Sequence, residues 1–180
     1  GSGIRYDMVL ADKTHGLDYL KEVVQHHTSG QMKIAPEHAD PKVLHLMGKP
    51  AVNSLIQFKA AFDKLSQEAG KNQFLTYYFI AAYPGCSDRE MKKLHEYASQ
   101  TLHLNPEQVQ VFTPTPSTYA SIMYYTEKDP CTGQPIFVEK NLARKQKQKE
   151  IITLKTTTPA RHNPMNQSNP RPRRDPHERK

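Results

Sequence analysis

The chain has 180 residues, enough for one domain with its own core, and 36% of them are hydrophobic. Its formal net charge of +7 comes from one end, because residues 140–180 hold 12 lysines and arginines against 3 acidic residues and the remainder is slightly acidic. A folded body that binds nucleic acid through a basic face is therefore disfavoured.

The beginning of the chain predicts a strand, a helix and a second strand. Residues 4–10 are interpreted as the first strand, because apolar and aromatic side chains recur there almost from the first position. In residues 17–27 the apolar side chains fall at helical spacing, and Gly30 follows where a glycine commonly ends a helix. Residues 31–35 then predict a short strand.

Two helices are predicted before the next strand. Asp40 and Pro41 are typical of a helix start, since aspartate caps the first turn and proline suits the first helical position. A longer helix is expected between Pro50 and Gly70, with apolar side chains on its inner face.

The clearest strand pattern lies in residues 74–82, a nearly continuous apolar run that is typical of a strand buried on both faces of a parallel sheet. Ser87 and Glu90 have the spacing of a capping box and predict the start of the next helix. Residues 108–112 predict a fourth strand. The prolines that follow it end the strand, because they cannot donate hydrogen bonds to a ladder.

The order of these elements predicts an α/β fold. A helix fits between each pair of the four predicted strands, so all four can be parallel with right-handed crossovers. Two architectures remain open at this point, a small doubly wound sheet and an arc of a (β/α) barrel. Four strands cannot close a barrel, and an arc alone has two exposed edges.

The rest of the chain has weaker patterns. Residues 122–125 predict a short strand or helix, residues 136–138 a β-arm, and residues 141–154 a basic helix. Residues 156–180 are rich in proline and arginine and lack aromatic side chains, which predicts disorder. For the basic segment, a solvated terminus is favoured over electrostatic attraction to RNA, DNA or an acidic protein surface.

The two cysteines, Cys86 and Cys131, favour a reduced, cytoplasmic protein, and a disulfide between them is the alternative. No apolar run has the roughly 20 residues of a membrane-spanning helix, so a soluble protein without a membrane partner is expected. The histidines are scattered and no metal-ligand spacing occurs, so no metal-binding residues are assigned.

Candidate ligand-binding residues lie at the predicted carboxyl ends of the strands, where parallel α/β folds place function. The carboxylate of Glu37 and the imidazole of His38 could bind an amine or a ribose or move a proton, and helix capping or solvent exposure is an equal alternative. The Pro84 and Gly85 turn could offer backbone N–H groups to a ligand, although an ordinary tight turn is favoured. Cys86 is interpreted as a small buried residue rather than a reactive thiol.

Several stretches, in this order and spacing, resemble the C-terminal half of the YgiQ-like radical-SAM family. They cover nearly all of residues 2–155 and are SGIRYD, HHTSGQMKIAPEH, LMGKP, FIAAYPGC, QVQVFTPTPST and MYYTEKDPCTGQPIFV, followed by the basic stretch.

This resemblance implies a partial (β/α) barrel that, in the intact protein, binds S-adenosylmethionine and a 4Fe–4S cluster. It also implies a cytoplasmic bacterial enzyme with an unknown substrate. The cluster-binding Cys-x-x-x-Cys-x-x-Cys motif of the family is absent from this chain. The chain is therefore expected to be inactive and to retain neither group by itself, with the N-terminal half of the same protein as its main partner.

The resemblance also suggests which residues contact the cofactor. At the strand ends it implies that Glu37 and His38 face S-adenosylmethionine. It further implies that the backbone after the sixth barrel strand, near Thr113 and Thr115, approaches the adenine. Many relatives have P-x-P-G-T where this chain has Ser117 in place of the glycine.

One further part of the cofactor site is implied by the resemblance. The end of the fifth barrel strand, here Ala82, Pro84 and Gly85, is expected to lie near the adenine or methionine part.

The sequence is thus interpreted as three regions. Residues 1–118 are assigned to the C-terminal half of the barrel, residues 119–155 to an irregular basic extension, and residues 156–180 to a disordered tail. The expected function is that of a radical-SAM enzyme fragment that contributes part of the cofactor and substrate cavity. The alternative is a non-catalytic α/β module whose basic extension docks protein or nucleic acid.

Overall fold

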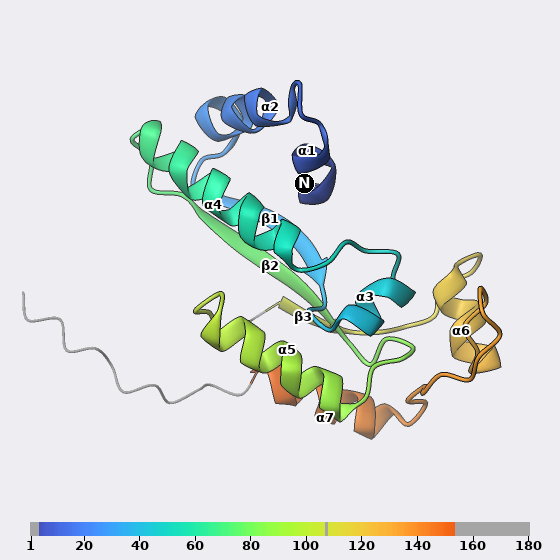
Figure 1. Ribbon diagram of the computed structural model, residues 1–180. Helices are drawn as coiled ribbons and strands as arrows, with labels where there is room; N and C mark the ends of the chain where they lie inside the picture. The colour runs from blue at the N-terminus through green and yellow to red at the C-terminus, as the bar shows by residue number, and fades with distance from the viewer. Residues whose placement is uncertain (1–3, 107, 154–180) are drawn as a thin grey trace, which may run out of the picture.

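The computed structural model describes residues 4–106 and 108–153, which form an α/β fold around a parallel sheet of three strands in the order β1-β2-β3 (Figure 1). The strands are β1 (Gln31–Glu37), β2 (Phe74–Ala81) and β3 (Gln108–Val111). The helical elements are α1 (Tyr6–Ala11), α2 (Gly16–Glu22), the π-helical η1 (Val23–His27), α3 (Pro41–Leu46), α4 (Asn53–Glu68), α5 (Asp88–Gln100), α6 (Tyr119–Thr126) and α7 (Leu142–Thr153). The predicted α/β class is confirmed.

The three strands are in register so that their carboxyl ends meet at one edge of the sheet. Gln31 of β1 pairs with Phe74 of β2, and the pairing becomes irregular between Ile34 and Glu37. Val111 of β3 pairs with Ala81, the last residue of β2. The loops after β1, β2 and β3 therefore begin next to one another.

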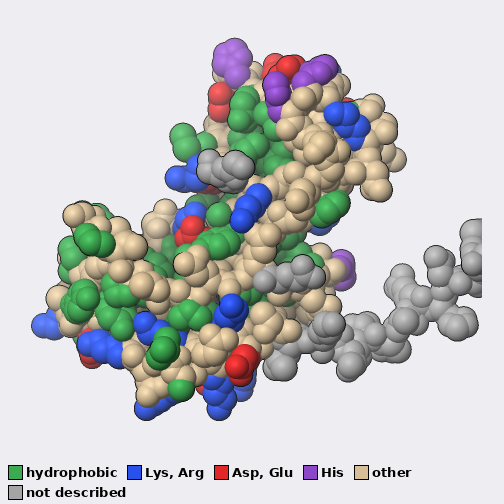
Figure 2. Space-filling view, turned by 180° about the vertical axis from the view of Figure 1, so that it is seen from behind, with side chains coloured by type: hydrophobic (Ala, Val, Ile, Leu, Met, Phe, Trp, Pro, Cys, Tyr) green, Lys and Arg blue, Asp and Glu red, His purple; other side chains and the backbone are tan. Residues whose placement is uncertain are grey.

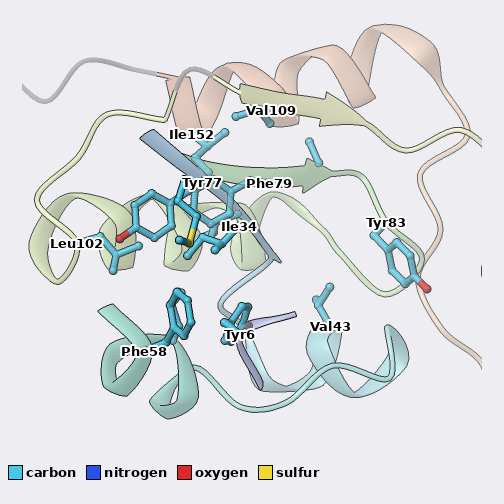
Figure 3. Packing of buried hydrophobic residues seen from close by; sticks show 14 of the residues in the cluster. Tyr6, Ile34, Val43, Phe58, Tyr77, Phe79, Tyr83, Leu102, Val109 and Ile152 are labelled. Carbon is cyan, nitrogen blue, oxygen red and sulfur yellow. The ribbon is translucent and has the colours of Figure 1, made fainter. Parts of the chain in front are cut away.

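One face of the sheet is apolar and packs against helices. Ile34, Phe79 and Val109, one from each strand, are buried, and Phe58 of α4 and Met91 of α5 belong to the same core cluster. Figure 3 shows side chains of this cluster pointing from the strands towards the helix layer. The prediction that residues 74–82 are buried on both faces of the sheet is wrong, because Tyr77, Phe79 and Ala81 are buried on this face whereas Phe74 on the opposite face is exposed.

The other face of the sheet is mixed, with the exposed Phe74 and the partly buried Ile80 beside polar side chains. Lys33, Gln108 and Gln110 are exposed, and Tyr78 is half-buried among them, with the ammonium of Lys33 lying 5.5 Å from its ring centre. The Tyr78 hydroxyl also contacts the amide oxygen of Gln110. Figure 2 views the molecule from behind, opposite to the side on which Figure 1 shows α4 and α5. A parallel sheet usually has both faces covered, so a face with exposed side chains such as Phe74, Lys33 and Gln110 is unusual.

The predicted first strand over residues 4–10 is wrong. Ile4 forms only an isolated parallel bridge with Ile34, and residues Tyr6–Ala11 form helix α1. The helix buries Tyr6 and Val9, three residues apart, and the Tyr6 ring lies 6.0 Å from that of Phe58 on α4. Because this packing needs helical spacing, it overrides the β-like alternation of the sequence, and the sheet of the described residues has three strands rather than four.

The second half of the chain agrees better with its predicted elements. The capping box of Ser87 and Glu90 begins α5, and residues 122–125 lie within helix α6. The predicted β-arm over residues 136–138 is wrong, since the nearest pairing is a single bridge between Lys128 and Pro135.

The basic helix predicted over residues 141–154 is present as α7, which packs against α5 and β3. The predicted disordered segment, residues 156–180, lies outside the described residues. Within the described ranges, no helix combines the length and apolar character needed to cross a membrane.

Candidate functional site

Residues with strained backbone follow the carboxyl ends of the strands. Glu37 at the end of β1 has φ 67°, Ala82 directly after β2 has φ 57°, and Ser117 in the loop after β3 has φ 62°. A positive φ costs about 1–3 kcal/mol for residues other than glycine and collects at functional sites. Among the described residues, two other non-glycine residues with positive φ, His103 and Glu127, lie elsewhere, and the three at the strand ends agree with the carboxyl-end edge of the sheet as the candidate site.

Glu37 occupies a tight turn with its carboxylate half-buried. The N–H of His38 donates to the carbonyl of Pro36 at 2.8 Å, so Glu37 is the central residue of a three-residue turn. The ammonium of Lys49 lies 3.2 Å from Glu37 Oε1 and donates to the carbonyl of Ala35 at 3.2 Å. The carboxylate is thus fixed by one cation and remains partly accessible to a ligand.

His38 is turned into the protein, with 1% of its surface exposed. Its Nδ1 accepts a hydrogen bond from the backbone N–H of Asp40 at 2.9 Å, so the neutral ring carries its proton on Nε2. That nitrogen lies 3.4 Å from the sulfur of Cys86. Burial lowers the pKa of His38 to about 4, which keeps the ring neutral near pH 7.

Cys86 is the centre of a buried contact between three parts of the chain. Its sulfur lies against His38 and within 3.8 Å of Gln148 Oε1 on α7, and Gln148 Nε2 donates to the Cys86 carbonyl at 3.4 Å. Burial raises the pKa of the Cys86 thiol well above its usual value. We call His38, Cys86 and Gln148 the buried polar node; it joins the ends of β1 and β2 to α7.

The turn formed by Pro84 and Gly85 is closed by a later segment of the chain. The N–H of Cys86 donates to the carbonyl of Tyr83 at 2.8 Å, and Gly85 has φ 88°, as the third position of a type II turn requires. The Gly85 N–H donates to the carbonyl of Phe137 at 2.7 Å. The Gly85 N–H, which the sequence suggested as a donor to a ligand, is thus hydrogen-bonded to the segment after α6. Ala82 and Pro84 are buried beside it.

The loop after β3 places Thr113 and Thr115 on the surface. The Thr118 hydroxyl donates to the carbonyl of Thr115 at 3.0 Å and accepts from the Ser121 N–H at 3.2 Å, which begins α6. Within the described residues, no hydrogen bond or ion pair joins Thr113 or Thr115 to Glu37.

Lys145 of α7 is a buried cation at the end of β3 that the sequence interpretation missed. Its ammonium donates to the Phe112 carbonyl at 3.4 Å and the Tyr124 hydroxyl at 3.2 Å, and lies 4.4 Å from the Tyr124 ring centre. Lys145, Gln148 and Ile152 are the buried residues of α7, and this helical spacing was the available signal. Because Lys145 and Gln148 are polar, the buried face of α7 does not stand out as an apolar pattern in the sequence.

We expect the two cysteines to react very differently with a thiol reagent. Cys131 is exposed and should be alkylated by N-ethylmaleimide in the native protein, whereas buried Cys86 should react only after unfolding. Mass spectrometry of tryptic peptides after a short exposure measures this directly. Equal labelling of both cysteines under native conditions would contradict the buried position of Cys86.

The similarity of this chain to known proteins extends over most of its length. Residues 107–169 match the family described as a domain of unknown function, DUF3362. The chain is 62% identical over 154 residues to the UPF0313 protein FN0734 of Fusobacterium nucleatum, 44% identical to a UPF0313 protein of Thermotoga petrophila and 41% identical to one of Clostridium perfringens. Most of the chain is therefore homologous to part of the UPF0313 proteins.

The matched stretch covers most of this chain but only a small part of each relative. The matched stretch is 86% of this chain but 27% of the Fusobacterium nucleatum and Thermotoga petrophila proteins and 23% of the Clostridium perfringens protein. The chain thus spans about a quarter of the length of the curated relatives that it matches.

Proposed function

We propose that this chain is part of a radical-SAM enzyme of the YgiQ-like type and forms one wall of its cofactor and substrate cavity. The second face of the sheet is the observation that carries the proposal, because a parallel sheet with helices on one face and exposed side chains such as Lys33, Gln108 and Gln110 on the other fits an arc of a (β/α) barrel. The resemblance of residues 2–155 to that family supplies the reaction class.

The free edge of β1 supports the same proposal. Ile4 pairs with Ile34 in parallel, so the chain enters the sheet along the edge of β1 that β2 does not occupy. In the proposed barrel, preceding strands of the longer polypeptide continue the sheet from this edge. The large part of the UPF0313 relatives outside the matched stretch is long enough to provide them.

Within the proposal, the predicted site residues have different tasks. Glu37 contacts the cofactor directly, because its partly accessible carboxylate can accept hydrogen bonds from an amine or a ribose. His38 acts from beneath the surface, holding the end of β1 against Cys86. Thr113 and Thr115 offer exposed backbone after β3, and Ala82, Pro84 and Gly85 form the floor between these two loops.

The iron–sulfur cluster does not fit the residues of this chain. Its two cysteines cannot supply three thiolates, and Cys86 is buried in the polar node while Cys131 is exposed. Among the described residues, no group of three or more histidine, cysteine or acidic side chains could hold a metal ion. The proposal therefore assigns the cluster to the rest of the longer polypeptide.

We expect the Glu37→Gln variant of the full-length polypeptide to bind S-adenosylmethionine roughly tenfold more weakly, the loss expected for one charge-assisted hydrogen bond. Isothermal titration calorimetry under anaerobic conditions measures the affinity. Glu96→Gln, on the exposed side of α5, is the matched control and should bind normally. Unchanged affinity in Glu37→Gln would remove Glu37 from the proposed cavity.

We also expect the 180-residue chain to remain colourless after anaerobic reconstitution with iron and sulfide, whereas the full-length polypeptide should gain the broad visible absorption of a cluster. Visible absorption spectroscopy and iron analysis on both proteins test this difference. A stable cluster on the short chain would contradict the assignment of the cluster to the rest of the polypeptide. A full-length protein without a cluster would contradict the enzyme proposal itself.

A further inference from the structure

A cavity of about 380 Å³ lies beyond the carboxyl end of β2, between the end of α3 and the start of α6. Four separate segments form its walls, namely residues 45–48, Tyr83, residues 118–120 with Met123, and residues 129–131. The residues that matter for its chemistry are Met47, Tyr83, Ala120, Met123, Asp129 and Cys131. This volume is within the range of small-molecule sites, which is roughly 300–1,000 Å³.

Internal hydrogen bonds fix the walls of this cavity. The Tyr83 hydroxyl donates to the carbonyl of Leu46 at 3.4 Å, which ties the end of β2 to α3. In the turn at its mouth, the Asp129 N–H donates to the Gln134 carbonyl at 2.9 Å and the Gly133 N–H donates to the Asp129 carbonyl at 2.8 Å. The cavity is therefore formed without help from another molecule.

The interior of the cavity suits a flat aromatic ring. Met123 is buried and Met47 is half-buried, so two polarisable thioethers reach the same space. Thioethers make favourable contacts with aromatic rings and adapt to their shape. Tyr83 adds an aromatic wall, and its ring is held at 5.2 Å from that of Phe112 in an edge-to-face arrangement.

The mouth of the cavity carries a negative charge. Asp129 Oδ1 accepts from the Cys131 N–H at 2.9 Å and Oδ2 accepts from the Thr132 hydroxyl at 2.8 Å, and these bonds lower the pKa of Asp129. Among the described residues, no lysine or arginine forms an ion pair with Asp129, and the nearby basic group is the imidazole of His45, which also lines the cavity and adds to the lowering of the Asp129 pKa. A cationic group on a ligand would be attracted to this carboxylate.

We infer that this cavity binds a small molecule that combines an aromatic ring with an ammonium group. The ring packs between Met47, Tyr83 and Met123, and the ammonium group lies near the Asp129 carboxylate at the mouth. The exposed thiol of Cys131 borders the same opening. Of its lining residues, Tyr83 adjoins Ala82 and Pro84 of the proposed cofactor cavity, but the inference rests on the contacts of the lining residues and does not depend on the radical-SAM proposal.

Tryptamine is a suitable probe because it combines an aromatic ring with an ammonium group. Analogues that lack one of these two features are readily obtained. We expect tryptamine to slow the alkylation of Cys131 by N-ethylmaleimide in the 180-residue chain and to show saturable binding by calorimetry. Indole-3-acetate, with the opposite charge, and butylamine, without the ring, should bind at least roughly tenfold more weakly, the difference made by one missing interaction of about 1.4 kcal/mol.

Variants on the two sides of α6 provide a matched comparison. Ala120→Phe should fill the cavity and abolish tryptamine binding, whereas Ile122→Phe introduces the same side chain at a position that does not line this cavity and should leave binding unchanged. Asp129→Asn should keep ring binding while removing the preference for the amine over the acid. Thermal unfolding monitored by circular dichroism shows whether Ala120→Phe is folded, and Met47→Glu is the second blocking variant.

Three results would overturn the inference. The first is no saturable tryptamine binding to the folded chain. The second is equal binding of tryptamine, indole-3-acetate and butylamine, which indicates unspecific apolar contact. The third is unchanged binding in folded Ala120→Phe and in Met47→Glu. Since no iron or sulfide is added in this experiment, none of these outcomes bears on the radical-SAM proposal.

Discussion

Lowering the pH from 7 to about 4 is expected to reduce the free energy of unfolding by about 3 kcal/mol through His38 alone. Burial lowers the pKa of its imidazole to about 4, against a usual value of 6.5, and each unit of difference corresponds to about 1.4 kcal/mol. Chemical denaturation at several pH values in this window measures the change.

The direction of this effect follows from proton binding. Between pH 6.5 and 4 the unfolded chain binds a proton at His38 that the folded protein does not, so stability falls as the pH falls. The full contribution of the neutral ring is present above pH 6.5 and is lost near pH 4. Asp40 and Glu90 favour a charged ring, and Lys93 opposes it, but burial is the largest influence.

A variant at the same position separates His38 from the other histidines. His38→Gln should be less stable at pH 7, because it disturbs the buried polar node, but its stability should depend less on pH in this window. His26→Gln, at an exposed position of η1, is the control and should keep the pH dependence of the unsubstituted chain. If His38→Gln shows the same pH dependence as the control, His38 is not the titrating group.

Much of the fold could be predicted because local patterns specify it. The nearly continuous apolar run of residues 74–82 forms strand β2 as expected, and the Ser87 and Glu90 capping box begins α5 at the predicted residue. Asp40 caps α3 through the backbone N–H groups of Lys42 and Val43. In each case the residues that determine the element lie within or next to it.

The failures arise where distant residues decide the structure. Residues 4–8 alternate between apolar and polar side chains like a strand, but the contact of Tyr6 with Phe58 on α4 favours a helix. In the same way, α7 has a polar sequence, and its inner face is recognised only when α5 and β3 are in place. A single sequence contains no direct signal for such contacts.

The candidate site could likewise be predicted only in part. Its location could be predicted, because parallel strands end at one edge of the sheet. The orientation of His38 could not, since its partner Cys86 is 48 residues away in the sequence. Gln148 is 62 residues from Cys86, and the carbonyl that accepts from Gly85 belongs to Phe137. The side chains thus need tertiary contacts that local spacing does not encode.

Replacing Gly85 by alanine is expected to destabilise the protein by about 3 kcal/mol. The residue has φ 88°, where an L-residue is strained by about 1–2 kcal/mol, and the added methyl group would lie 2.3 Å from Leu46 Cδ1. Overpacking of this kind costs about 1–3 kcal/mol. The free energy of unfolding from urea denaturation measures the sum.

Two further variants separate the strain from the clash. Gly48→Ala has a similar φ of 64° but nothing within 4 Å of the added methyl group, so it should cost only the backbone strain. In Gly85→Ala combined with Leu46→Ala, the shortened side chain should remove the clash. The double variant should therefore lose less unfolding free energy than the sum of the losses in the two single variants. Strict additivity would mean that Leu46 does not confine the turn.

The Gly85 N–H donates to the Phe137 carbonyl, so Gly85→Ala should also speed hydrogen exchange of that amide. Faster exchange would show that this turn holds the segment after α6 in place.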